Sequence, residues 1–274
     1  FRITAIQSRF AQKTLYFYGL LVVVSSIVIA WLSKKEIVGQ ARNDESLGNK
    51  KMMFLEKIYY FLRDLSSRPE ERGERSAGYL QDRIRRAALA MCAQPRGRLL
   101  EVGCGEGLFL ARLAKLNPDA EIWGVDSWPQ ILAKARERFI KNGLARIKLA
   151  QAEARQLPFE DVYFDMVFFI NVLICIRSWE DAAAAIKELS RVLKPGGRLI
   201  LEFRNRRNIL LKAKYKLAKF YDATTADHPL STYDEDKVGG LLKKMGFEVR
   251  NVQTIGFFVK KLAPVIIIEA QKHA

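Results

Sequence analysis

The chain has 274 residues, of which 49% are hydrophobic and 28% are charged. This size allows one sizeable domain with an accessory segment but not two full domains, and the composition excludes wholesale disorder. Cys92, Cys104 and Cys175 lack the spacing of a metal site or a disulfide scaffold, so we expect no metal and a reducing compartment. The formal net charge of +16 predicts an anionic partner, either nucleic acid or a membrane surface.

Residues 15–33 predict a single transmembrane helix after an N-terminal flank of residues 1–14. The run is uncharged between Lys13 and Lys34 and spans about 27 Å as a helix, close to the hydrocarbon thickness of a bilayer. A signal peptide would end at a small-residue cleavage site, and a core helix would show a polar face; this run has neither. Basic residues are more numerous after the run, so we expect a single-pass membrane protein with a cytoplasmic catalytic domain.

Residues 34–75 predict a polar juxtamembrane linker followed by an amphipathic helix. Apolar residues recur at helical spacing from Phe54 to Leu65, and the charged run Arg68–Arg75 ends the helix. Two interpretations of this helix stay open. It either packs on the following domain, or lies at the membrane interface as a lid that admits an acceptor from the bilayer.

The remaining residues, 76–274, alternate apolar strand-like runs with amphipathic helices. This pattern predicts an α/β fold, Rossmann-like and doubly wound, with a mostly parallel seven-stranded sheet and a C-terminal antiparallel hairpin. The predicted strands are 98–102, 121–125, 147–150, 166–170, 198–203, 247–254 and 264–269. The predicted helices include 79–92, 108–116, 128–142 and 182–193.

A glycine-rich turn follows the first predicted strand. Its sequence, Gly103-Cys104-Gly105-Glu106-Gly107, has the spacing G-x-G-x-G, and Glu101 precedes it. Glycines there allow a tight turn and a close approach of ligand to backbone, although a lone turn of this kind is often only a strand-to-helix connector. The neighbouring carboxylates suit a cationic ligand and penalise the pyrophosphate of a dinucleotide.

The second predicted strand ends at Asp126, which is placed to accept both hydroxyl groups of a ribose; as a lone residue it could instead cap a helix. Further along stand Glu153-Ala154 before a Leu-Pro-Phe run, and the turn Leu193–Leu199, which reads LKPGGRL. With these runs, residues 76–274 resemble the class I S-adenosylmethionine-dependent methyltransferases, in the broad type 11 group that includes ubiquinone and menaquinone methyltransferases.

The resemblance implies S-adenosylmethionine as cofactor and assigns the residues that hold it. Glu101, Gly103 and Gly105 would hold the methionine moiety, Asp126 the ribose, and Glu153 with Ala154 the adenine edge. The family more often has Asp where this chain has Glu153. The remaining residues expected at the cofactor are Cys104, Gly107, Ser127 and Asn171.

Methyl transfer from a sulfonium depends mainly on alignment, so the sequence need not contain a general base. Asn171 and His228 are the candidate catalytic residues. Asn171 either lines the pocket or makes a strand-end hydrogen bond, and His228 is either a base or an ordinary loop residue. The residues after Asn171 depart from the N-P-P-Y motif, which disfavours methylation of exocyclic amines.

Residues 204–236 contain a basic amphipathic stretch. It is either an element that rests on anionic headgroups or a solvated face. The sequence therefore predicts a methyltransferase acting on a small, lipid-soluble or lipid-linked acceptor at the membrane surface. One alternative is an RNA methyltransferase, which the net charge favours but which the membrane anchor and the lack of a recognisable RNA-binding module disfavour, so nucleic acid is not the expected partner. The other is a membrane-tethered S-adenosylmethionine-binding protein without turnover.

Overall fold

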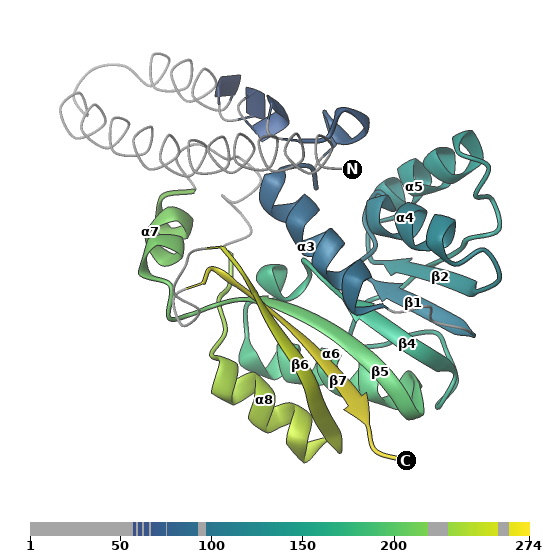
Figure 1. Cartoon of the computed structure of the whole chain (residues 1–274), viewed down its shortest axis with the longest axis vertical. Coiled ribbons are helices and arrows are strands. Elements are labelled where there is room, and N and C mark those ends of the chain that lie inside the picture. Colours follow the sequence, from purple (N-terminus) through teal and green to yellow (C-terminus); the bar gives the residue numbers. More distant parts are fainter. Residues whose placement is uncertain are drawn as a thin grey trace, which may run out of the picture. The chain divides into compact units, whose positions relative to one another are not determined.

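The computed structural model describes residues 57–58, 60–61, 63–65, 67–74, 76–92, 97–218, 230–256 and 263–274. The chain divides into two compact units. The first comprises Phe1–Asp82 and Ile209–Pro229, and the second comprises Arg83–Asn208 and Leu230–Ala274. The second unit holds the sheet and its flanking helices (Figure 1).

A seven-stranded sheet with the order β3-β2-β1-β4-β5-β7-β6 forms the centre of the second unit. Neighbours among β1 to β5 pair in parallel, whereas β7 is antiparallel to both β5 and β6. The expected mostly parallel sheet with a C-terminal antiparallel hairpin is therefore confirmed. The strands are β1 (Arg98–Val102), β2 (Glu121–Asp126), β3 (Lys148–Gln151), β4 (Phe164–Phe169), β5 (Leu193–Arg204), β6 (Phe247–Ile255) and β7 (Val265–Lys272).

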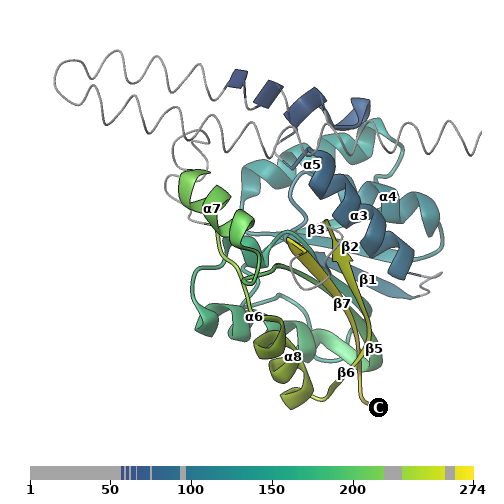
Figure 2. The ribbon, with the colours of Figure 1, turned by 60° about the vertical axis from the view of Figure 1, so that its left-hand side comes forward.

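Helices cover both faces of this sheet (Figure 2). One face carries α4 (Leu108–Leu116) and α5 (Pro129–Lys141), which contact β2 and β3. The opposite face carries α6 (Trp179–Val192), which contacts β5, and α8 (Glu235–Lys244), which contacts β6. Buried residues recur on α6 at spacings of three and four, the pattern of a helix that packs one face on a sheet; they are Ala182, Ala185, Ile186, Leu189 and Val192.

The central strands are buried on both faces, as parallel strands under two helical layers must be. Three charged side chains of β1 and β5 are nevertheless buried: Glu101, Glu202 and Arg204 are 3%, 0% and 2% exposed. All three lie toward the carboxyl ends of their strands, the edge where open α/β sheets bind ligands. The sheet order reverses between β1 and β4, so this edge is also the topological switch point.

Two elements differ from the predictions. Strand β5 begins at Leu193 rather than Arg198, because Leu193 pairs with Phe164 and a register shift then accommodates the Pro-Gly-Gly turn. The structure also contains α8, which the sequence did not predict. Gly239 and Gly240 interrupt this helix and hid its periodicity.

The first unit contains the other expected elements only in part. The described residues between 57 and 65 are helical, as their spacing predicts, and η1 (Pro69–Glu71) follows. Of α3 (Tyr79–Met91), residues 79–82 belong to this unit and the rest to the second. The basic stretch forms α7 (Ile209–Ala218). Residues 15–33, residues 34–56 and His228 lie outside the described residues, so the transmembrane helix and the proposed base stay predictions. Among the residues that are described, no helix combines the length and apolarity needed to cross a bilayer.

Two glycine-to-alanine substitutions test the packing of this fold. A Cβ at Gly124 in β2 would lie 2.5 Å from Leu110 and 2.9 Å from Leu149, so Gly124→Ala should destabilise the protein by about 1–3 kcal/mol. A Cβ at Gly240, inside α8, would meet no atom within 4 Å, so Gly240→Ala should stabilise it by about 0.5–1 kcal/mol. Denaturant unfolding of both variants measures the difference; equal effects would contradict the packing around β2.

Candidate cofactor and acceptor site

The turn between β1 and α4 is built from glycines in the left-handed backbone region. Gly103, Gly105 and Gly107 have φ values of 76°, 51° and 73°. Hydrogen bonds also tie the turn to the adjacent strand, because the amides of Gly103 and Cys104 donate to the carbonyl of Val125 at 2.7 and 3.0 Å. The backbone of the turn is therefore fixed in a conformation that favours glycine.

Only one of these three glycines faces open space. A Cβ at Gly103 would lie 2.2 Å from Cγ2 of Val172, and one at Gly107 would lie 2.5 Å from the ring of Phe139. At Gly105 the nearest atom to such a Cβ is Cδ1 of Ile131 at 3.9 Å. Gly103 and Gly107 thus serve packing, whereas Gly105 leaves room for a ligand to approach the backbone.

Asp126 closes the second side of the site at the end of β2. Its Oδ2 accepts a hydrogen bond from the amide of Gly105 at 2.9 Å, and its Oδ1 accepts one from the amide of Trp128 at 3.1 Å. Asp126 therefore orders both the glycine turn and the start of α5. Each carboxylate oxygen has a second lone pair, so the residue can still accept the two hydroxyls of a ribose.

Glu101 supplies a buried carboxyl group beside the turn. Its Oε2 has no hydrogen-bond partner among the residues that the structure describes. Burial raises the pKa of Glu101 well above its ordinary value, with the charge of Arg85 opposing the rise and that of Asp126 adding to it. A buried acidic group with an unsatisfied oxygen fits a ligand that brings a positive charge and N–H donors, as the ammonium group of S-adenosylmethionine would.

Cys104 contributes to the site through its backbone. Its side chain is 6% exposed, and its Sγ lies 3.0 Å from the position of a Cβ built on Gly124, within the sheet. Burial, with Glu101 and Asp126 as further causes, raises the pKa of this thiol well above its ordinary value. The thiol is therefore neutral and unsuited to nucleophilic chemistry.

The predicted adenine-side residues follow β2 and β3, whose carboxyl ends lie together. The amide of Ala152 donates to the carbonyl of Asp126 at 3.1 Å, and Nε2 of Gln151 donates to the carbonyl of Ser127 at 3.2 Å. Glu153 is exposed and Ala154 is half-buried. Apart from Asn171, the expected cofactor residues thus lie along three adjacent strand ends, those of β1, β2 and β3.

Asn171 follows β4 and has a left-handed backbone, with φ of 60°. Its amide donates to Oε2 of Glu202 at 2.8 Å, which is the strand-end hydrogen bond that the sequence left as one interpretation. Its side-chain Oδ1 accepts from Arg204 at 3.0 Å, and Arg204 pairs with Oε1 of Glu202. Glu202 and Arg204 were not predicted as site residues. Their signal in the sequence is two charges at the end of the apolar run Leu199–Phe203.

Tyr233 is a further residue that sequence analysis did not assign. Its amide donates to the carbonyl of Arg204 at 2.7 Å and its hydroxyl donates to the carbonyl of Ile176 at 2.6 Å. Burial raises the pKa of Tyr233 to about 12. The phenol is therefore neutral near pH 7 and serves to position the chain rather than to accept a proton.

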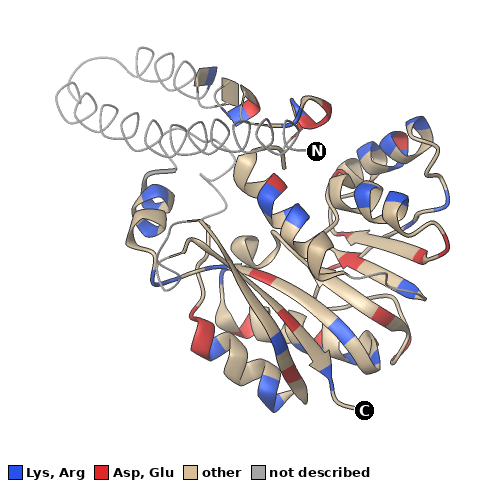
Figure 3. Cartoon of the chain, viewed as in Figure 1, with Lys and Arg blue, Asp and Glu red and all other residues tan. Residues whose placement is uncertain are grey.

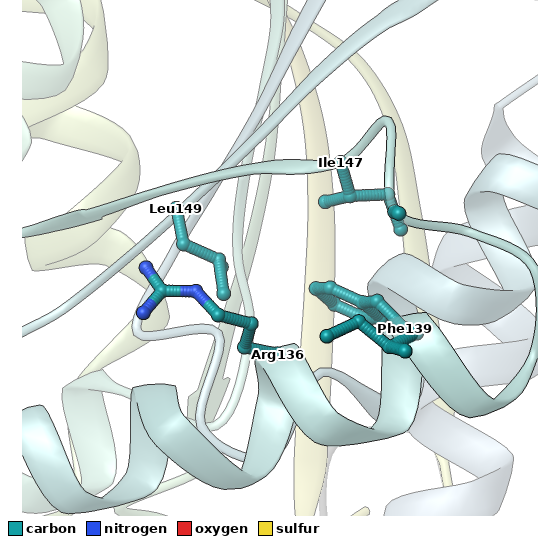
Figure 4. Close-up of a pocket in the computed structure, with 6 residues that line it drawn as sticks. Arg136, Phe139, Ile147 and Leu149 are labelled. Carbon is teal, nitrogen blue, oxygen red and sulfur yellow. The ribbon is translucent and has the colours of Figure 1, made fainter.

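A separate small hollow lies between α5 and the start of β3 (Figure 4). Its volume of about 240 Å³ falls below the roughly 300–1,000 Å³ of typical ligand pockets. Its lining residues are Arg136, Phe139, Ile140, Ala145, Ile147 and Leu149. None belongs to the glycine turn or the strand ends, so this hollow is not the cofactor site. Within the described part of the chain, no group of three or more His, Cys, Asp or Glu residues could hold a metal ion.

The raised pKa of Glu101 predicts that a cationic ligand releases a proton when it binds. The free protein holds the proton, and a neighbouring positive charge favours the carboxylate, so affinity for S-adenosylmethionine should rise with pH until the free-protein pKa is passed. Titration calorimetry between about pH 5 and pH 8, in buffers of different ionisation enthalpy, measures this release. Glu101→Gln should weaken binding and abolish the release. An unchanged release in that variant would assign the proton to another group.

Residues 99–197 match a family model described as a methyltransferase domain. A ubiquinone/menaquinone biosynthesis C-methyltransferase of Teredinibacter turnerae is 35% identical over 130 residues, which are 46% of this chain and 51% of that protein. A demethylmenaquinone methyltransferase of Thermus thermophilus is 38% identical over 125 residues, 45% of this chain and 54% of that protein. The chain thus spans about half the length of the curated relatives it matches.

Solved structures share the fold of the second unit. A magnesium protoporphyrin IX methyltransferase from Synechocystis, solved with bound SAH, superposes with a TM-score of 0.55 at 20% identity, over 70% of this chain and 81% of that chain. An S-adenosylmethionine-dependent methyltransferase from Mesorhizobium loti superposes with a TM-score of 0.54 at 16% identity, over 68% of this chain and 96% of that chain. The family match, the relatives and the shared fold together support an S-adenosylmethionine-dependent methyltransferase.

Proposed function

We propose that this chain transfers a methyl group from S-adenosylmethionine to a small, lipid-soluble acceptor of the quinone type at a membrane surface. The observation that supports the cofactor most directly is the geometry around Gly105. Open space lies at that residue, and its amide is held by Asp126. The unsatisfied carboxyl oxygen of Glu101 belongs to the same end of β1.

In this proposal the cofactor lies along the ends of β1, β2 and β3. Glu101 and the backbone at Gly105 hold the methionine part, Asp126 the ribose, and the Glu153-Ala154 segment the adenine. Bound S-adenosylmethionine supplies an electrophilic methyl group: an acceptor carbon takes it with its own electron pair, the carbon–sulfur bond pair stays on sulfur, and the acceptor carbon loses its proton to solvent. The protein contributes alignment and exclusion of water, the terms that dominate such a displacement.

The sequence relatives support an acceptor of the quinone type. Their names give ubiquinone, menaquinone or demethylmenaquinone as the molecules they act on or help to make. A ring carbon next to a phenolic oxygen of a reduced quinone is electron-rich, so it needs no dedicated general base to attack. This agrees with a site in which Tyr233 is neutral and Cys104 is buried.

The membrane surface is supported by the apolar run at residues 15–33 and by α7. On α7, Ile209 and Leu210 are 75% and 51% exposed, although both are large and apolar. Lys212 and Lys216 are exposed beside them, and the basic residues that Figure 3 shows on this helix are all lysines. Exposed apolar residues next to lysines are typical of a helix that rests on anionic headgroups.

The first test of the proposal is binding and turnover by the full chain in detergent. It should bind S-adenosylmethionine and not NAD, and Asp126→Ala should weaken binding by more than about 1 kcal/mol through lost ribose hydrogen bonds. Incubation with demethylmenaquinone reduced by dithionite should then transfer labelled methyl from S-adenosylmethionine to the quinol. Titration calorimetry measures the first result and mass spectrometry the second.

The outcomes separate the competing functions. Binding of S-adenosylmethionine without transfer to a quinol or to RNA would favour a tethered binding protein. Transfer to RNA and not to the quinol would favour RNA methylation. Failure of a demonstrably folded chain to bind S-adenosylmethionine would reject all three.

The membrane part of the proposal predicts protection of α7 by anionic lipid. In nanodiscs that contain phosphatidylglycerol, amide hydrogen exchange in α7 should slow by about tenfold relative to phosphatidylcholine discs, and Ile209→Ser/Leu210→Ser should remove the difference. Val249→Ser/Val252→Ser is the matched control, because these valines of β6 are also exposed, by 40% and 42%. Equal exchange of α7 on both lipids would contradict a lipid-facing role.

A further inference from the structure

The carboxyl ends of β4 and β5 are joined by a closed ring of polar contacts. The amide of Asn171 donates to Oε2 of Glu202, the other oxygen of Glu202 pairs with Arg204, and Arg204 donates back to Oδ1 of Asn171. Glu202 is 0% exposed and Arg204 is 2% exposed. Both the backbone and the side chain of Asn171 are therefore fixed by one buried ion pair.

Stability does not explain this ring. Burying two charges costs desolvation free energy that their attraction often only balances, so apolar residues would serve a core at least as well. Asn171 is also a non-glycine residue at φ 60°, a backbone conformation that proteins retain mainly at binding and catalytic sites. A strained residue held by a costly ion pair points to a functional position for its side chain.

The ring fixes which end of the Asn171 amide faces outward. A guanidinium only donates hydrogen bonds, so the atom facing Arg204 must be the amide oxygen. The Nδ2 group then points away from Arg204. This NH₂ group has no hydrogen-bond partner among the described residues. It is also not a buried atom left without a partner, unlike Oε2 of Glu101. Asn171 thus presents an available N–H donor.

The strand order locates this donor. The proposed cofactor residues follow β1, β2 and β3, on one side of the switch point, whereas Asn171 and its partners belong to β4 and β5, on the other. The next residue, Val172, packs against Gly103, since a Cβ there would lie 2.2 Å from its Cγ2. The donor therefore adjoins the cofactor turn on the side left for the acceptor.

We propose that Asn171 contacts the acceptor: its Nδ2 donates a hydrogen bond to an acceptor oxygen beside the carbon that is methylated. Glu202 and Arg204 are positioning residues that hold Asn171 in this orientation. The inference rests on the proposed function and deepens it, because a donor at this place selects acceptors with a phenolate or quinol oxygen. It also assigns Asn171 to the acceptor rather than to the cofactor.

The donor would favour the ionised form of a quinol, because a hydrogen bond to the charged form lowers the pKa of the oxygen. An ionised ring is the better carbon nucleophile. One contact thereby both orients the acceptor and raises the fraction of it that reacts.

The decisive variant is Asn171→Asp. Aspartate tolerates the left-handed backbone and still accepts from Arg204, but it replaces the outward donor with a carboxylate oxygen. With reduced demethylmenaquinone as the probe, kcat/KM for the quinol should fall by about 10- to 100-fold, the range for a lost hydrogen bond to a charged group. The Kd for S-adenosylmethionine should stay within about twofold. Asn171→Gly, which suits this backbone without strain, should give a smaller loss than the aspartate variant.

A second measurement tests the contact without turnover. The side-chain NH₂ resonance of Asn171, identified by its absence in Asn171→Asp, should shift when the anion of 2-hydroxy-1,4-naphthoquinone is added in the presence of S-adenosylhomocysteine. If the wild type methylates no quinol but this resonance shifts, the quinol substrate is wrong and the contact holds. An unmoved resonance, a weakened Kd for S-adenosylmethionine in Asn171→Asp, or full activity of that variant would each overturn the inference.

Discussion

The carboxylate of Asp126 is the interaction on which the site depends. It accepts hydrogen bonds from Gly105, in the turn after β1, and from Trp128, at the start of α5. One side chain thus fixes the two loops that border the cofactor side of the sheet, before any ligand is present. Gly105 has a positive φ and no side chain, and the space beside it is open. The hydrogen bond from Asp126 therefore fixes the backbone of Gly105 while a ligand can still reach it. Preorganisation of this kind reduces the entropy that binding must otherwise cost.

Buried charge marks the rest of the same edge. Glu101 in β1 and the Glu202–Arg204 pair in β5 occupy positions where the neighbouring strand residues are apolar. The two groups differ in whether their polar atoms have hydrogen-bond partners. Glu202 and Arg204 satisfy one another and Asn171, whereas Glu101 retains an unpaired oxygen. We infer that the Glu202–Arg204 pair holds Asn171 in place, whereas the unpaired oxygen of Glu101 is free to bind a charged ligand.

The sequence predicted the parts of this site that depend on local pattern. Hydrophobic periodicity located all seven strands, and the glycine spacing and Asp126 located the turn after β1 and the end of β2, because turn geometry and strand ends are encoded locally. It could not predict the Asn171 ring, since the left-handed backbone of Asn171 is imposed by partners about thirty residues later in the chain. Nor could it show that Cys104 faces the sheet or that α8 forms across Gly239 and Gly240, because packing decides both.

The family model matches only part of the second unit. The matched residues, 99–197, include the glycine turn, Asp126 and Asn171 but end before Glu202 and Arg204. The residues proposed to bind the cofactor therefore lie within the matched part, whereas Glu202 and Arg204, which hold Asn171, lie outside it. A methyltransferase can change its acceptor without disturbing its cofactor if the two are controlled from different strands. In the proposed arrangement the ends of β1 to β3 hold the cofactor and those of β4 and β5 face the acceptor, so substitutions in β5 should alter acceptor choice while cofactor affinity is retained.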